Sequence, residues 1–473
     1  MNATAPPHQV FIGTFIHSKA LDDLEYLHGT AVFVDGPTGK IVAVEGVDGH
    51  SGRLDETFTK LGWNPAEAGD KGKDVNFFFP GFIDTHIHAS QYPNVGIFGK
   101  STLLAWLDTY TFPLEAGLGR DLAKARRVYG RCVRRTLSHG TTTAAYYATI
   151  DVAATNLLLD ICLARGQRAL VGRVCMDEER TCPAWYKDES PSQTLSRTRE
   201  CVAHARRRDP EGHIVRAIVT PRFAPSCTPA SMRALGDLAR EEGLAVQTHV
   251  SENKGEIDLV REMFPAESGG GRGYAGVYDA FGLLGERTIL AHGVHLGEGE
   301  AELLRDRGAK VSHCPCSNSA LASGAARVRW LLEKGVDVGL GTDVSGGYSP
   351  SVLEAARQAS LVSRHVAMGG DEGAKLSVEE VLYLATRGGA KCVGLEGRVG
   401  GFEVGMEWDA QLVRLGGVGD GESEGEGESE DQGNVDVFGW ESWEEMVAKW
   451  LFNGDDRNTK RVWVKGKLVH ERA

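Results

Sequence analysis

The sequence has no run of about 18 consecutive apolar residues, which a membrane-spanning helix would need. Residues 1–8 also lack a charged stretch followed by an apolar one, so we expect no secretory signal. The nine cysteines are odd in number and scattered without the spacing of a disulfide framework, which is typical of reduced thiols in the cytosol. We therefore expect a cytoplasmic protein that does not bind a membrane.

Basic residues are fewer than acidic ones: the chain has 52 Lys and Arg, 65 Asp and Glu, and a formal net charge of −13. Such a surface repels the phosphates of nucleic acids and anionic lipids, so we expect neither as a partner. Seven of the acids lie in 416–433, a segment rich in Gly, Glu, Asp and Ser that contains no Lys or Arg. Because it cannot bury enough apolar surface to fold, we predict a disordered insertion there.

Short apolar runs alternate with amphipathic stretches through most of the 473 residues. This alternation predicts parallel βα units, and eight of them predict an α/β fold with a (β/α)8 TIM barrel. The predicted strands are 77–83, 141–146, 169–174, 215–220, 244–248, 288–291, 309–312 and 336–340. The predicted helices are 121–138, 155–164, 193–207, 230–242, 255–263, 300–306, 326–333 and 351–368.

The two ends of the chain do not fit the barrel. Short β-like runs lie at 9–16 and 30–44 before it, and at 409–413 and 461–469 after it. We predict that they assemble into a small β-sandwich. The predicted domains are the sandwich at 1–79 and 400–473, with the acidic insertion inside it, and the barrel at 80–399.

Side chains that can hold a metal ion lie at or near the ends of predicted strands. His86 and His88 are two residues apart on a strand, so their imidazoles point the same way. His249, His292 and Asp343 each follow a later apolar run. One such histidine is often only a structural residue, but these strand ends meet at the face of a barrel where active sites are built. The pattern predicts a metal site of imidazole and carboxylate ligands.

Longer strings around these residues carry a family resemblance. The strings are PGFIDTHIHASQYPN, VTPRF, HVSENKGEI, AHGVHL, SHCPCSNSALASG and GLGTDVSGGYSPSVLEAARQAS. With them the chain, from about Val10 onward, resembles the guanine deaminase branch of the amidohydrolase superfamily. The superfamily shares the metal-binding residues, and the strings HIHASQY and GLGTDVSGGY narrow the resemblance to the guanine branch. One departure is Cys316, where members commonly carry Asn, and it puts the detail of that loop in question.

The resemblance implies hydrolytic deamination of guanine to xanthine and ammonia, by a zinc-bound hydroxide that attacks C2. One Zn²⁺ per subunit would be held by His86, His88, His249 and Asp343, although Fe²⁺ also suits such ligands. The predicted strand 215–220 has no lysine to bridge two metals, which favours one. The resemblance also implies a homodimer.

The same resemblance assigns roles to further residues. Asp343 would take the proton of the attacking water, His292 would orient that water, and Glu252 would protonate the purine at N3 and then the leaving amine. The implied purine contacts are Gln91, Arg222 and Phe223. Two aromatic residues that could line the same pocket are Trp106 and Tyr348.

Each of these residues has an ordinary alternative. Glu252 could be a solvated residue before the next helix, and His292 could cap a loop. Gln91 could lie on the surface, and Arg222 could only pair with a carboxylate. At the level of the protein, the alternatives are a relative that acts on a pterin, 8-oxoguanine or a triazine, and a metal-free scaffold without activity. The cysteine-ligated nucleobase deaminases are excluded because their H-x-E and P-C-x-x-C strings are absent.

Overall fold

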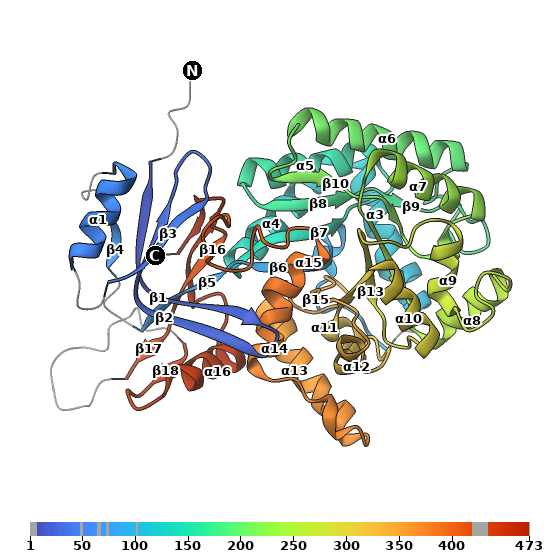
Figure 1. Cartoon of the computed structure of the whole chain (residues 1–473). Coiled ribbons are helices and arrows are strands. Elements are labelled where there is room, and N and C mark those ends of the chain that lie inside the picture. The colour runs from blue at the N-terminus through green and yellow to red at the C-terminus, as the bar shows by residue number, and fades with distance from the viewer. Residues whose placement is uncertain are drawn as a thin grey trace.

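The computed structural model describes residues 7–47, 51–63, 68–71, 75–100, 103–418 and 434–472. Figure 1 shows two parts, a sheet that carries both ends of the chain and a barrel of strands surrounded by helices. No helix within the described ranges is long and apolar enough to cross a membrane.

Strands from both ends of the chain form one eight-stranded sheet. Its order is β20-β19-β16-β5-β1-β2-β3, with β4 paired to β1. The strands are β1 (Gln9–Ala20), β2 (Asp23–Val34), β3 (Ile41–Gly46), β4 (Ala68–Lys71), β5 (Asn76–Pro80), β16 (Ala410–Arg414), β19 (Thr459–Val464) and β20 (Lys467–Glu471). The two chain ends meet where β5 pairs antiparallel with β16, with Phe78 opposite Leu412.

The sheet curls around an aromatic core. Phe11 of β1 stacks on Trp408 with ring centroids 4.4 Å apart. It also contacts Trp463 of β19 edge-on at 5.2 Å, although β5 and β16 separate these strands in the sheet. A flat sheet would hold such rings much farther apart, because neighbouring strands lie about 4.8 Å from each other. The sheet therefore encloses its own core, as a sandwich does.

The barrel consists of two four-stranded parallel sheets, β10-β8-β7-β6 and β12-β13-β14-β15. Their strands are β6 (Phe82–His88), β7 (Thr141–Tyr147), β8 (Arg168–Gly172), β10 (Val215–Ala217), β12 (Val246–Val250), β13 (Thr288–His292), β14 (Lys310–His313) and β15 (Val338–Leu340). Short strands β9 (Val174–Cys175) and β11 (Thr220–Pro221) pair beyond β8 and β10. A bridge between Val219 and Val246 joins the two sheets, and a 2.8 Å bond from Asp343 N to His86 O closes the ring. The predicted fold class is confirmed.

Helices cover the outside of the barrel (Figure 1). Those that follow the sequence prediction are α4 (Leu122–Ser138), α5 (Val152–Arg165), α6 (Pro191–Arg208), α7 (Pro229–Glu242), α8 (Lys254–Met263), α10 (Glu298–Arg307), α12 (Val328–Glu333) and α13 (Val352–Met368). Local sequence sets their ends. The Thr228 side chain accepts a hydrogen bond from Ser231 N to cap α7, Pro229 occupies its first position, and Gly243 ends it at φ 65°.

Other helices complete the structure. They are α1 (Ser51–Leu61), α2 (Leu103–Trp106), α3 (Phe112–Arg120), α9 (Gly273–Ala280), α11 (Pro315–Ala320), α14 (Val378–Tyr383), α15 (Gly389–Cys392) and α16 (Trp443–Asn453). Shorter turns include η2 (Ala89–Asn94), η3 (Leu107–Thr111), η4 (Ala224–Ser226), η5 (Glu372–Ala374) and η6 (Leu384–Gly388). Of these elements, η2, α2 and α3 lie between the first and second barrel strands and supply side chains to the site.

Two predictions about elements need correction. The predicted first barrel strand, 77–83, is two strands, because the chain passes from the sheet to the barrel at Gly81. Gly81 N donates to Asp409 O in the sheet, and Phe82 N donates to Gly140 O in the barrel, each at 2.9 Å. The acidic insertion was predicted from 416, but β17 (Gly416–Gly417) pairs with β18 (Asp436–Val437). The rest of that predicted segment, 419–433, lies outside the described residues.

Candidate metal centre and active site

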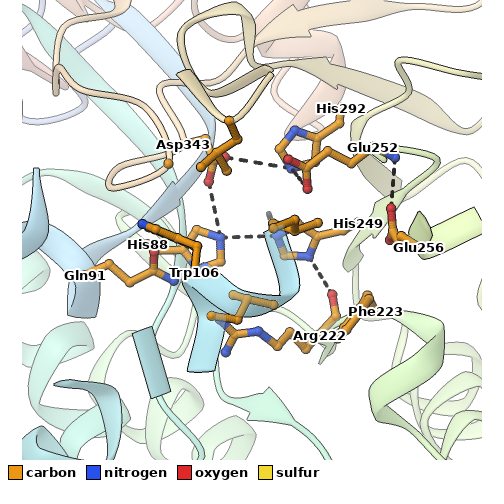
Figure 2. A pocket seen from close by; sticks show the side chains of 14 residues that line it. His88, Gln91, Trp106, Arg222, Phe223, His249, Glu252, Glu256, His292 and Asp343 are labelled. Carbon is orange, nitrogen blue, oxygen red and sulfur yellow. Dashed lines mark hydrogen bonds and ion pairs between the residues drawn. The ribbon is translucent and has the colours of Figure 1, made fainter. Parts of the chain in front are cut away.

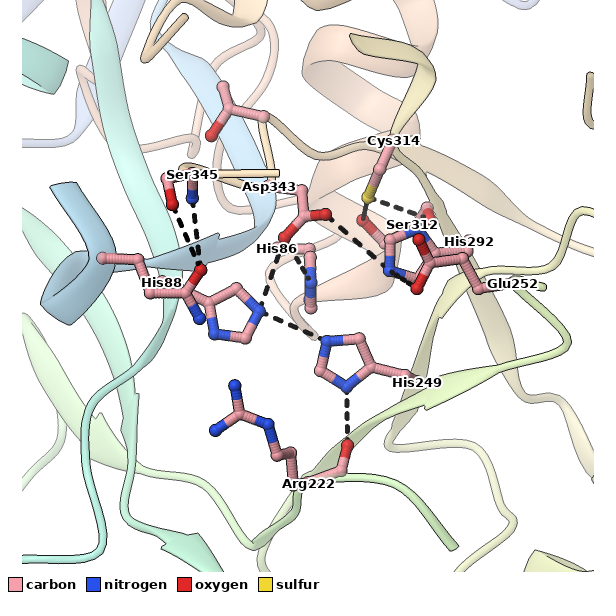
Figure 3. Close-up of polar contacts among 12 residues, drawn as sticks. His86, His88, Arg222, His249, Glu252, His292, Ser312, Cys314, Asp343 and Ser345 are labelled. Carbon is pink, nitrogen blue, oxygen red and sulfur yellow. Dashed lines mark hydrogen bonds and ion pairs between the residues drawn. The ribbon is translucent and has the colours of Figure 1, made fainter. Parts of the chain in front are cut away.

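The predicted metal ligands and the predicted catalytic residue His292 meet at the C-terminal ends of four barrel strands (Figure 3). His86 and His88 lie on β6, His249 on β12 and His292 at the end of β13, and Asp343 follows β15. All are buried except His249, which is partly accessible through the pocket it lines. The convergence follows from the fold, because parallel strands of a closed barrel end at one face.

The backbone turns sharply at two of these residues. His292 has φ 75° and Asp343 has φ 47°, left-handed values that are uncommon for residues other than glycine. Bonds from Gly293 N to Val250 O and from Asp343 N to His86 O hold the two turns against neighbouring strands. Such strain is typical of functional sites, and here it directs both side chains across the mouth of the barrel.

The ligand atoms lie as close together as the ligands of a single metal ion do. His86 Nε2 lies 3.1 Å and His88 Nε2 lies 3.4 Å from Asp343 Oδ1. His88 Nε2 and His249 Nε2 are 3.2 Å apart. A tetrahedron with metal–ligand bonds of about 2.0–2.1 Å has edges of about 3.3 Å. Three imidazole nitrogens and one carboxylate oxygen therefore fit a single ion.

Hydrogen bonds and burial prepare the ligands for a cation. His249 Nδ1–H donates to Arg222 O at 2.6 Å, which leaves the Nε2 lone pair free to coordinate. Burial lowers the pKa of His88 and of His249 well below its usual range, so both imidazoles are neutral. Burial opposes the ionisation of Asp343, but the surrounding imidazoles, His86 first, lower its pKa well below its usual range.

A group able to transfer protons lies beside the ligands. His292 Nδ1 is 2.9 Å from the Asn318 side-chain oxygen, while its Nε2 is 3.4 Å from Glu252 and 3.8 Å from Asp343. Glu252 is 3% exposed and accepts a 3.1 Å hydrogen bond from Ser323. Burial raises the pKa of Glu252. Glu252 is therefore a buried residue that faces His292, and the alternative of a solvated position before α8 does not hold.

A cavity opens beside the ligands (Figure 2). Its metal side is lined by His88, His249, Glu252, His292 and Asp343. Its other walls include Gln91, Leu103, Trp106, Leu107, Arg222, Phe223 and Leu321.

The predicted purine contacts lie on this cavity. Gln91 is 2% exposed, so it is not a surface residue. Arg222 lines the cavity and also pairs with a carboxylate, Glu115. Tyr348 is not among the lining residues, and it is 36% exposed and bonded to Glu354. Cys316 packs into the hydrophobic core, also away from the cavity.

Two buried acids near the cavity were missed by the sequence analysis. Glu256 lines it and accepts bonds from the backbone nitrogens of Glu252 and Asn253, at 3.0 and 3.3 Å. Burial, and next the neighbouring Glu252, raise its pKa to about 7. The capping string Asn253-Lys254-Gly255-Glu256 was a usable signal. Glu115 lies on α3, and no local pattern marks it.

Similarity to known proteins shows the family of this chain. Residues 77–469 match the Amidohydrolase family. The chain therefore belongs to the amidohydrolase family.

Within that family the chain belongs with the guanine deaminases, and it is an enzyme of the hydrolase class. It is 44% identical to the probable guanine deaminase of Schizosaccharomyces pombe, over 97% of this chain and 83% of that protein. It is 39% identical to the guanine deaminase of Homo sapiens, over 99% and 98%. The crystal structure of guanine deaminase from C. acetobutylicum, with bound guanine in the active site, superposes with a TM-score of 0.84 at 31% identity, covering 98% of this chain and all of that one.

Proposed function

We propose that the protein hydrolyses guanine to xanthine and ammonia, with one Zn²⁺ per subunit. The observation that carries this proposal is that three members of the ligand set, His88, His249 and Asp343, line one cavity together with the Gln91 amide and the Arg222 guanidinium. His86 completes the set beside Asp343. Whole-length similarity to guanine deaminases supports the choice of guanine.

His86, His88, His249 and Asp343 are the proposed zinc ligands. When bound, the ion supplies a Lewis acid that lowers the pKa of a coordinated water to about 7, which makes a nucleophile available for C2 of guanine at neutral pH. Zinc suits three imidazoles and a carboxylate, and open catalytic sites keep a position for water.

The protein's own groups move the protons. Asp343 accepts the proton that the attacking water loses, and His292, held by Asn318, orients that water. Glu252 carries a proton to N3 of the ring and then to the leaving amine. Its burial favours this role, because a carboxyl with a raised pKa can both hold and release a proton near neutral pH.

Gln91, Arg222 and Phe223 are the proposed purine contacts. The amide and guanidinium donate to O6 and the neighbouring ring nitrogens, and the phenyl group packs on the ring face. Adenine presents an amino group where guanine has O6, and it has no leaving group at C2. Sites built on buried hydrogen bonds reject such analogues by about 10⁴–10⁵-fold.

Ammonia release tests this function. We expect rapid release from guanine and essentially none from adenine or cytosine. A pterin, 8-oxoguanine and a triazine are assayed alongside them as alternative substrates. Arg222→Lys should keep a cation beside Glu115 but lose the planar fork, so kcat/KM for guanine should fall while zinc content is unchanged. Adenine turnover that rivals guanine turnover would contradict the proposal, and preference for another heterocycle would reassign the substrate.

We further propose that the enzyme is a cytoplasmic homodimer with no nucleic-acid partner. The homodimer is inferred from the likeness to guanine deaminases. Light scattering of the purified protein tests the assembly, and a monomer mass would reject it.

A further inference from the structure

We propose that Glu115 is a positioning residue that fixes the donor pattern of the purine site, and so sets its preference for an oxygen over an amino group at position 6. This inference rests on the proposed function, because it concerns the residues assigned there to the purine edge. Glu115 lies on α3 and is fully buried at 0% exposure.

One carboxylate holds both polar purine contacts. Arg222 Nη1 donates to Glu115 Oε2 at 2.8 Å, and Arg222 Nη2 donates to Oε1 at 3.3 Å. Gln91 Nε2 donates to the same Oε1 at 2.9 Å. The Tyr186 hydroxyl donates to Oε2 at 2.7 Å. Each carboxylate oxygen therefore accepts two hydrogen bonds, which occupy its two lone-pair sites.

The contact with Glu115 determines which way the Gln91 amide faces. A glutamine amide can rotate by half a turn and exchange its donor for its acceptor, with little change in shape. Because Nε2 donates to Glu115, Oε1 faces Ser345, whose backbone nitrogen and hydroxyl both lie 3.4 Å away. Gln91 then offers its second N–H, and not its oxygen, to the cavity. A donor at the cavity wall complements O6 of guanine and opposes the amino group of adenine.

Helix α3 also orients the guanidinium through a second residue. The Phe112 ring lies one turn before Glu115 on the same face of the helix, and the Arg222 guanidinium sits over it, 5.1 Å from the ring centroid. Arg222 is 2% exposed, and a buried cation needs a paired carboxylate. Arg222 Nη1 also donates to Met176 Sδ at 3.8 Å. With these contacts in place, the N–H groups of Arg222 that contact neither Glu115 nor Met176 remain as donors for the substrate.

The first test is Glu115→Gln, assayed for guanine KM and kcat, turnover of 2,6-diaminopurine, zinc content and melting temperature. 2,6-Diaminopurine has the same C2 amino group as guanine but carries an amino group in place of O6. The variant keeps the shape but brings an amide donor against the donors of Gln91 and Arg222. We expect KM for guanine to rise by about tenfold or more, with a smaller fall in kcat and unchanged zinc content. The guanine preference, which is the ratio of kcat/KM for guanine to that for 2,6-diaminopurine, should fall.

Glu407→Gln is the matched control. Glu407 is also a buried glutamate paired with a buried arginine, Arg168, but that arginine begins β8 at the opposite end of the barrel from the ligands. We expect this control to lower melting temperature without changing KM or substrate preference.

Glu115→Asp separates positioning from stability. It keeps the charge beside Arg222 but is shorter by one methylene, so it cannot reach Gln91 and Arg222 together. If Glu115→Gln is insoluble, the aspartate variant should fold and still show the raised KM. A wild-type KM and wild-type guanine preference in either soluble variant would overturn the role of Glu115 alone. No ammonia from guanine with the wild-type enzyme would overturn the proposed function, and this inference with it.

Discussion

Glu252 is the residue on which the proposed proton transfer depends. It is buried between Ser323 and His292, and its backbone nitrogen is held by Glu256. These contacts fix the carboxyl group at the edge of the cavity, beside the ligand set. A carboxyl group held in this way can deliver a proton without first changing its rotamer.

Glu252→Gln tests this role. The neutral amide is similar in size, so we expect folding and zinc content to be retained, while kcat falls by about 10²–10⁴-fold because the amide cannot transfer protons. Steady-state kinetics with guanine, combined with metal analysis, measure both effects. An unchanged kcat with only a higher KM would make Glu252 a contact and not a proton carrier.

The sequence alone predicts which residues meet at the site when their position is set by the strand that carries them. His86, His88 and Asp343 lie at or next to the ends of apolar runs, and a parallel barrel brings such ends together whatever lies between them. Asn318 and Glu115 could not be predicted in this way. They lie on helices, and only tertiary packing decides whether a helical side chain reaches the cavity.

At the scale of elements, the helices and most barrel strands were predicted because hydrophobic periodicity and capping residues mark them. The run from 77 to 83 was misread because apolar residues occupy both the last sheet strand and the first barrel strand. Periodicity cannot show that consecutive residues pair in different sheets. The pair Pro80-Gly81 marks the change, since Gly81 bonds to the sheet and Phe82 to the barrel.

A deletion tests whether the acidic segment is needed for folding or activity. Gly416–Gly417 pairs with Asp436–Val437, so a clean deletion should begin after this pairing and remove only 419–433. We expect replacement by an uncharged Gly/Ser linker of about twelve residues, long enough to return between parallel strands, to leave kcat/KM and melting temperature nearly unchanged. Thermal unfolding and guanine kinetics measure the outcome. A large loss of activity or of soluble protein would assign the segment a role in folding or regulation.

At the scale of the whole molecule, the sheet and the barrel are joined by a buried ion-pair network. Arg168 of β8 donates to both carboxylate oxygens of Asp409, at 2.7 and 2.9 Å, and also pairs with Glu407. The C-terminal segment that adds strands to the sheet therefore also contacts the start of β8. At the other end of the barrel, the bond between Asp343 N and His86 O closes the ring. This bond joins two of the proposed metal ligands, so the contact that closes the barrel also places these two residues side by side.

We propose that one metal ion at this site drives guanine deamination. The most direct test is to remove the metal, titrate Zn²⁺ back, and follow ammonia release from guanine together with bound zinc, in wild type and in Asp343→Ala. The account predicts that activity rises with zinc to a plateau at one ion per chain, and that Asp343→Ala binds zinc more weakly and stays inactive. Full activity in the metal-free enzyme, a plateau at two ions per chain, or substantial turnover by Asp343→Ala would contradict it.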